Sequence, residues 1–264
     1  MRIKTLASGS SGNCTVIVSG SSVILIDAGI SARRIEDGLK ESGISPDRVS
    51  AILVTHEHID HVAGLKVLLK HWQIPVYASR GTVRSYLHSA GPGVDPALFH
   101  EVSAEKPFQA GAFSVSAFPL SHDATEPFAY RVFDGKKSAA LMTDLGYYTD
   151  EHAAFLKGVN ALILEANHDV RMLETGSYPY VLKRRILSDF GHLSNENAGQ
   201  LLLKVLHPGL ELCLLAHLSE ENNLPELALL SVKTEIDLSG TGISSDTYKI
   251  ETAPRGVPSP FYNI

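Results

Sequence analysis

The sequence predicts an α/β protein of the α+β type, built as a four-layer αββα sandwich. Short β-branched segments separated by Gly and Ser turns open each half of the chain, and strand and helix patterns alternate afterwards. A half of this kind gives a sheet with helices outside, so two halves packed sheet to sheet give the four layers. No Pro- or Ser-rich linker divides the chain, and we expect a single domain over residues 1–264.

The N-terminal half supplies the first predicted sheet. Antiparallel strands are indicated by three short β-branched runs, MRIKTL, CTVIVS and SVILID. The segment SARRIEDGLKESG predicts a helix, because it begins with a capping serine, repeats apolar residues at Ile35 and Leu39, and stops at a glycine. We then expect the buried strand AILVT, a helix that starts near Asp60, and the strand PVYAS.

The C-terminal half supplies the second predicted sheet. Residues 103–142 return to a period of two, with a hairpin turn at Asp134-Gly135. Strand and helix then alternate in the order NALILEA, SNENAGQLLLKVL, ELCLLAH and PELALLSVKTEI. Three prolines in the tail TAPRGVPSPFYNI predict that residues from about 252 to 264 are irregular.

Composition limits the environment and the partners. The formal charge of −6 argues against a general electrostatic grip on nucleic acid, unless acidic side chains are present to hold cations. No apolar run approaches the ~18 residues that a membrane span needs, and we expect a cytoplasmic protein without a membrane contact. Cys14 and Cys213 are too few for a disulfide framework and are expected to be buried thiols.

The segment THEHIDH at residues 55–61 is the strongest chemical signal. It places His56, His58, Asp60 and His61 within six residues, directly after a predicted buried strand. Three imidazoles and a carboxylate crowded together repel one another on charging unless a metal ion holds the histidines neutral. The segment is not the helical HExxH zinc motif, since Asp60 stands where the second histidine would be. We therefore predict a metal site of a different kind.

Further metal ligands are expected where other predicted strands end. His122, Asp144 and His217 each follow an apolar run, and a sheet can present such residues rigidly from its rim. Asp27 closes the strand VILID, and we expect it to hold the histidine segment in place without binding a metal itself.

Taken in order, these residues resemble the five motifs of the metallo-β-lactamase superfamily, over residues 27–217. The resemblance implies that one metal ion is bound by His56, His58 and His122. It implies that a second is bound by Asp60, His61 and His217, with Asp144 bridging the two. Histidine and carboxylate ligands without a thiolate admit zinc, manganese or iron.

Within the superfamily, phrases such as SGSSGN, LSHDA, TDLG and GHLSN resemble the bacterial YycJ/WalJ-type (VicX-like) group. That group implies a phosphodiesterase or nuclease, with exonuclease action on DNA favoured over RNA. By resemblance to transfer-RNA 3′ endonucleases, Glu165 and His192 form a proton-transfer pair near the leaving group, and we take Asp60 as the third catalytic residue. His192 can equally be a histidine that holds its loop by hydrogen bonds.

Several residues are candidates for contacts with substrate. Ser11 and Asn13 lie in SGSSGNC, which is a turn between strands and not a P-loop, because a strand follows it and no GK[ST] ending is present. His168 follows Glu165 closely and is expected at the cleft. Lys183 and Arg184 belong to a basic and aromatic stretch that fits either phosphates and bases or a solvated helix face.

Two other functions remain open from the sequence. A hydrolase of a cyclic phosphodiester, a thioester or a lactone could use the same two-metal core. A non-catalytic regulatory protein is the other alternative, although seven intact ligands speak against it. The oligomeric state is not indicated by the sequence.

Overall fold

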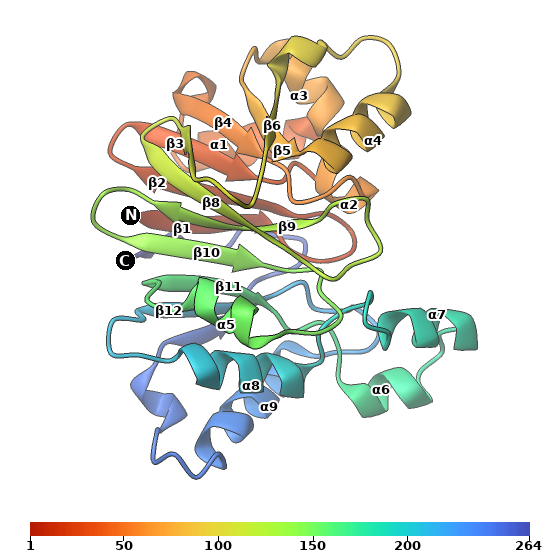
Figure 1. Cartoon of the computed structure of the whole chain (residues 1–264), viewed down its shortest axis with the longest axis vertical. Coiled ribbons are helices and arrows are strands. Elements are labelled where there is room, and N and C mark those ends of the chain that lie inside the picture. Colours follow the sequence, from red (N-terminus) through yellow and green to blue (C-terminus); the bar gives the residue numbers. More distant parts are fainter. The chain divides into compact units, whose positions relative to one another are not determined.

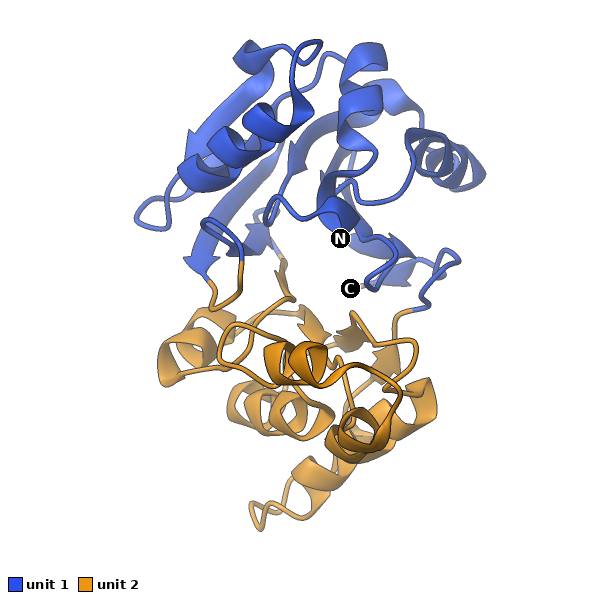
Figure 2. Ribbon diagram, turned by 90° about the vertical axis from the view of Figure 1, so that its right-hand side faces the viewer, with its two compact units in different colours: residues 1–119, 124–136, 254–263 blue, residues 120–123, 137–253, 264 orange.

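The computed structural model describes residues 1–264, which divide into two compact units (Figure 2). Unit 1 comprises residues 1–119, 124–136 and 254–263, and unit 2 comprises residues 120–123, 137–253 and 264. The expectation of a single domain stays a prediction. No helix combines the length and the apolar character that crossing a membrane requires.

Unit 1 contains a seven-stranded sheet in the order β14-β1-β2-β3-β4-β5-β6 (Figure 1). Strands β1, β2 and β3 pair antiparallel, as predicted, and β3 to β6 run parallel. The strands are β1 (Arg2–Ala7), β2 (Cys14–Ser19), β3 (Ser22–Ile26), β4 (Val49–Leu53), β5 (Val76–Ser79), β6 (Phe99–Val102) and β14 (Tyr262–Asn263).

The helices of unit 1 pack on this sheet and form a common core with it. Apolar residues such as Ile35, Leu39 and Leu68 join strand residues in this core. The helices are α1 (Ala32–Glu41), α2 (Ile59–Val62), α3 (Leu65–His71) and α4 (Arg80–Ala90).

The helix that the sequence predicts from Asp60 onward is interrupted at Gly64. A Cβ atom there would lie 2.1 Å from the carbonyl oxygen of Ile30, and the Gly64 amide donates to Ala28. This close backbone approach separates α2 from α3.

A three-stranded antiparallel ribbon completes unit 1. It consists of β7 (Phe108–Ala110), β8 (Phe113–Pro119) and β9 (Phe128–Phe133). Phe108 stacks on Tyr77 of β5 with ring centroids 5.1 Å apart, and the Tyr130 hydroxyl donates to the Val54 carbonyl at 2.9 Å. The unit therefore carries sheet on sheet, with helices on the large sheet.

Unit 2 is built on four parallel strands, β10 (Ser138–Met142), β11 (Ala161–Glu165), β12 (Leu212–Ala216) and β13 (Ile250–Thr252). Nearly all residues of the first three are buried, which explains their continuous apolar sequences. The helices are α5 (Asp150–Leu156), α6 (Val170–Thr175), α7 (Tyr180–Ile186), α8 (Asn195–Val205) and α9 (Pro225–Asp237). Ser194 caps α8, since its side chain accepts from the Asn197 amide.

The irregular C-terminal tail needs a correction at its end. Residues 253–261 contain no helix or strand, but Tyr262–Asn263 forms β14 and pairs with β1. Ser259 and Thr5 exchange two hydrogen bonds of 2.8 and 3.0 Å, and these bonds keep the tail along β1 despite its prolines.

Candidate metal centre

The histidine segment of unit 1 gathers four predicted metal ligands. It follows β4, and α2 begins at Ile59. The ring centroid of His56 lies 4.6 Å from that of His58 and 4.0 Å from that of His61. Asp60 Oδ2 lies 3.4 Å from His61 Nε2. The structure therefore brings these residues together, as expected from their spacing.

Asp27 and Thr55 orient two of the rings. Asp27 Oδ2 lies 2.8 Å from His61 Nδ1, and Thr55 Oγ1 donates to Asp27 while it lies 3.1 Å from His56 Nδ1. Burial raises the pKa of Asp27, and the contacts with His61 and Thr55 oppose that rise. Because these contacts engage Nδ1 of both rings, Nε2 is the atom that each ring can offer to a metal.

Asn13 also fixes the histidine segment. Its side-chain amide lies 3.1 Å from His61 Nε2 and donates to the Asp60 carbonyl at 3.2 Å, while its oxygen accepts from the Gly9 amide at 2.8 Å. Asn13 is buried, whereas Ser11 is exposed. Of the two predicted substrate contacts, only Asn13 therefore lies against the predicted ligands of this unit.

Unit 2 contains a second cluster of ligand-type side chains. Asp144, Glu165, His192 and His217 each place a nitrogen or oxygen atom so that all four lie within 4.8 Å of one another. Asp144 and His217 follow β10 and β12, and Glu165 ends β11. Parallel neighbouring strands end at one edge of a sheet, and this topology assembles the cluster from distant parts of the sequence.

His122 joins this cluster from the short segment 120–123. Its Nε2 lies 3.9 Å from Asp144 Oδ1, and its Nδ1 donates to the Gly191 carbonyl at 3.0 Å. Burial lowers the pKa of His122, although Asp144 opposes this, and the ring is favoured in the neutral form that metal binding requires.

Glu165 contacts two histidines of the second cluster. Its Oε1 lies 2.9 Å from Nδ1 of both His192 and His217, and its Oε2 accepts from the amides of Leu145 and Leu193 at 3.1 and 3.0 Å. Burial by itself would raise the pKa of Glu165, but His192 and His217 bring it down to about 2. The carboxyl is therefore ionised at neutral pH and acts on the two rings as an acceptor.

Three site residues have an unusual backbone. Asp27, Asp144 and His217 are non-glycine residues with positive φ, at 62°, 65° and 56°. Each follows the buried end of a strand, where the left-handed turn redirects the side chain. Such conformations cost about 1 to 2 kcal/mol and concentrate at functional sites.

Buried asparagines stabilise the turn at His217, and no spacing pattern in the sequence indicated them. Asn167 donates to the His217 carbonyl at 2.8 Å, and Asn223 donates to the carbonyls of Ala166 and Asn167. Thr55 and Asn167 are thus positioning residues that could not be assigned from spacing.

Two of the predicted substrate contacts are engaged by the protein itself, His168 by burial and Lys183 by hydrogen bonds to the end of a helix. His168 is 1 % exposed, and burial lowers its pKa to about 4. The Lys183 ammonium donates to the carbonyls of Glu174 and Gly176 at 2.8 and 2.7 Å, where α6 ends. Arg184 is exposed.

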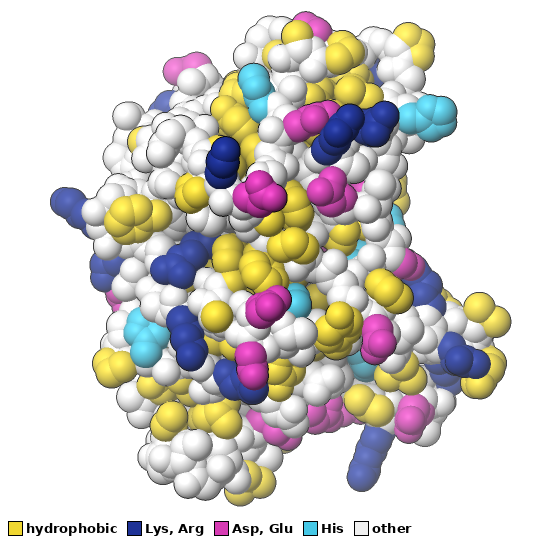
Figure 3. All heavy atoms as spheres, viewed as in Figure 1, with side chains coloured by type: hydrophobic (Ala, Val, Ile, Leu, Met, Phe, Trp, Pro, Cys, Tyr) yellow, Lys and Arg dark blue, Asp and Glu magenta, His cyan; other side chains and the backbone are white.

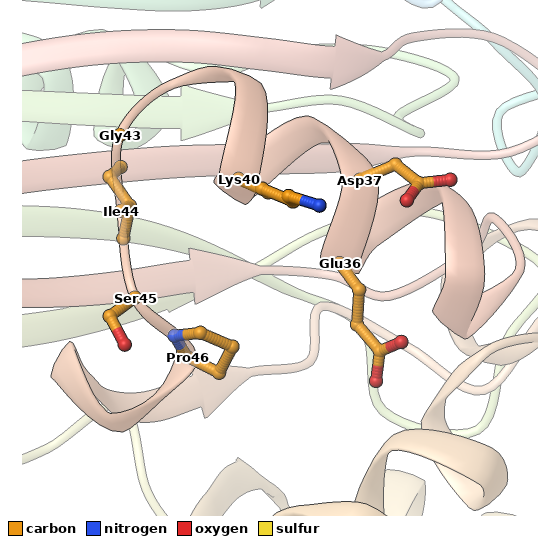
Figure 4. Close-up of a pocket in the computed structure, with 7 residues that line it drawn as sticks. All are labelled: Glu36, Asp37, Lys40, Gly43, Ile44, Ser45 and Pro46. Atoms are coloured by element: carbon orange, nitrogen blue, oxygen red, sulfur yellow. The ribbon is translucent and has the colours of Figure 1, made fainter.

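Unit 1 contains several cavities. One of about 540 Å³ is formed by the end of α1 and the loop to β4 (Figure 4), and no predicted site residue lines it. Another of about 380 Å³ is lined by Glu57 and Ile59 of the histidine segment and by Tyr86 of α4.

Comparisons with known proteins identify the family of the chain. Residues 23–216 match the family described as "Beta-lactamase superfamily domain". The chain is 39 % identical over 256 residues to Exodeoxyribonuclease YycJ of Bacillus anthracis, covering 97 % of this chain and 96 % of the relative. It is 38 % identical over 250 residues to Exodeoxyribonuclease WalJ of Streptococcus pneumoniae, covering 94 % and 93 %.

A solved structure shows the fold. The metallo-β-lactamase fold protein YhfI from Bacillus subtilis superposes with a TM-score of 0.70 at 18 % identity, covering 98 % of both chains. The predicted fold class is thereby confirmed.

Proposed function

The chain belongs to the β-lactamase superfamily, and from this membership we propose that it is a metal-dependent exonuclease that hydrolyses phosphodiester bonds of DNA. The observation that carries the proposal is a complete set of ligand-type residues in a chain that matches two named exodeoxyribonucleases over more than nine-tenths of its length. The class of metal-dependent hydrolase follows from the family itself.

We assign the ligands as the superfamily motifs imply. His56, His58 and His122 would hold one divalent ion, and Asp60, His61 and His217 would hold the other. Asp144 would bridge them.

The donor chemistry supports this assignment. Imidazole and carboxylate suit zinc, manganese and iron, and Nδ1 of His56, His61, His122 and His217 is already engaged by a hydrogen-bond partner. When bound, two such ions supply the Lewis acidity that activates water and stabilises the charge on a phosphodiester during its cleavage.

His192 is the residue that we assign to proton transfer to the leaving oxygen. Glu165 fixes its Nδ1 at 2.9 Å, so that Nε2 is the atom available to a substrate. His192 retains 15 % of its side-chain exposure, whereas Glu165 has none. Glu165, ionised and fully buried, is thus a positioning residue in this proposal.

A digestion assay with several substrates tests the function. End-labelled single- and double-stranded DNA and RNA are incubated with the protein and added manganese or zinc, with bis-p-nitrophenyl phosphate alongside. We expect stepwise release of nucleotides from DNA, and we expect Asp144→Ala to abolish it and to lower metal content. His88→Ala changes an exposed histidine of α4 and should retain full activity.

The outcomes separate the proposal from its alternatives. Full activity of Asp144→Ala would refute the ligand assignment. Cleavage of bis-p-nitrophenyl phosphate without cleavage of any polymer would favour a hydrolase of small substrates. Failure to bind zinc or manganese would favour a non-catalytic protein on this fold.

A further inference from the structure

The segment 170–191 of unit 2, which we call the arm, differs in charge from the rest of the chain. It comprises α6, α7 and the turn that leads to Gly191. The chain as a whole has a formal charge of −6, but cations outnumber acids in the arm, with Arg171, Lys183, Arg184 and Arg185 against Glu174 and Asp189. Because Arg185 is paired with Asp123, the arm offers a polyanion a small local excess of positive charge.

Large apolar side chains of the arm are exposed. Tyr180 is 72 % exposed, Val181 79 %, and Phe190 59 %. Figure 3 shows hydrophobic and basic side chains together over α7. Tyr180 and Arg184 are four residues apart on this helix, so the ring and the guanidinium occupy the same helix face.

The base of the arm is tied to the segment that carries His122. Arg185 makes a bidentate ion pair with Asp123 at 2.5 and 3.0 Å. The Asp123 amide donates to the Phe190 carbonyl at 3.2 Å. With the bond from His122 to the Gly191 carbonyl, these contacts fix Phe190 beside one predicted metal ligand and two residues before His192.

Two of the arm's cations are used to build it. Lys183 joins α7 to the end of α6, and Arg185 joins α7 to Asp123. Arg184 is left to face solvent beside Tyr180. The basic and aromatic stretch of the sequence is therefore divided into residues that shape the arm and residues that face outward.

We propose that the arm binds single-stranded DNA, with Tyr180 and Phe190 stacking on bases and Arg184 contacting the backbone. This inference rests on the proposed nuclease function and names the form of its substrate. Exposed rings stack on any base, and an unpaired strand presents free base faces along its whole length, whereas the interior bases of a duplex already stack on one another. A paired cation and ring on one helix face suits a nucleic acid better than an apolar protein surface.

Direct binding tests the arm separately from cleavage. The affinity for fluorescein-labelled oligothymidylate is measured by fluorescence anisotropy for the unaltered protein and for Tyr180→Ala/Phe190→Ala. We expect the double variant to bind at least about tenfold more weakly. Its KM for single-stranded DNA should rise by the same factor, far more than any change in its kcat or in its hydrolysis of bis-p-nitrophenyl phosphate.

Two further variants sharpen the test. Phe133→Ala removes another exposed aromatic ring, from β9 in unit 1, and should bind oligothymidylate normally. Arg184→Ala should reduce the slope of log Kd against log salt by about 0.7, which corresponds to one phosphate contact on a single strand.

The binding proposal and the nuclease proposal would be refuted by different experimental results. If the double variant cleaves DNA with unchanged affinity and KM, the proposed DNA-binding role of the arm is refuted and the proposed nuclease function is not. If oligothymidylate binding depends on Tyr180 and Phe190 but no nucleic acid is cleaved, the DNA-binding role of the arm is supported and the nuclease function is refuted. An equal loss of affinity for closed circular duplex DNA would overturn the assignment to single strands.

Discussion

Replacement of Glu165 by glutamine should destabilise the protein by about 3 kcal/mol or more. The carboxylate accepts from four donors, two imidazole nitrogens on Oε1 and two backbone amides on Oε2. Glutamine retains one oxygen, so its NH₂ group must face either the two backbone amides or the two Nδ1 atoms, which can accept only after both rings change tautomer. Each lost bond to a buried charged group costs about 1.5 to 3 kcal/mol.

The pKa of Glu165 gives a second route to the same magnitude. It falls from 4.5 to about 2 on folding, and a shift of roughly 2.5 units corresponds to about 3 kcal/mol. Because the pKa in the folded state is depressed, this stability is complete above pH 4.5 and is lost as the pH falls toward 2. The free energy of unfolding of Glu165→Gln should therefore be furthest below that of the unaltered protein at neutral pH, and the difference should shrink in acid.

Urea unfolding of metal-free protein between pH 7 and pH 3 measures both effects, provided that the m-value is unchanged. Glu226→Gln changes an exposed glutamate of α9 and should have no effect. If Glu165→Gln lowers the free energy of unfolding by less than about 1 kcal/mol at pH 7, or if its difference from the unaltered protein does not shrink in acid, Glu165 does not hold the two histidines as a carboxylate.

Three other substitutions give independent checks. Asp27→Asn should weaken metal binding about 10- to 100-fold, measured by competition with a chelator, because it removes the carboxylate acceptor of a ligand histidine. His168 has a pKa of about 4 in the fold, so the unaltered protein should lose about 3 kcal/mol as the pH falls from 6.5 to 4, and unfolding of His168→Asn should lack this loss. Gly29→Ala would place a Cβ 1.6 Å from the Asp60 carbonyl oxygen and should lower the Tm by several degrees, whereas Gly256→Ala, with open space around it, should not.

The regular elements could be predicted where a strong periodic signal was present. Buried strands such as β4 and β11 and capped helices such as α1 and α8 are read directly from their apolar spacing and their capping serines. The helix α6 escaped prediction and α7 was indicated only as one of two readings of the basic stretch, since six or seven residues span fewer than two turns and show no recognisable period. They became visible only with the contacts that hold them, above all the bonds of Lys183.

The candidate site was predictable at the level of ligand-type residues and not at the level of their neighbours. Within THEHIDH, local geometry alone forces the side chains together. For Glu165 and His217, 52 residues apart, the signal was their place at the ends of buried strands. His168 lies three residues after Glu165, beyond the end of β11, and its side chain is buried.

The three residues with positive φ show how the ligand-type residues depend on their neighbours. A β-branched or apolar side chain tolerates positive φ poorly, whereas the backbone at Asp27, Asp144 and His217 adopts it directly where a buried strand ends. The resulting turn aims a polar side chain away from the strand direction and requires partners that keep it there. Asp27 has Thr55 and His61, and the turn at His217 has the Asn167 amide. A polar residue that follows an apolar strand therefore predicts a site only when the chain also supplies the groups that stabilise its turn, and those groups lie 28 residues away for Thr55 and 50 for Asn167.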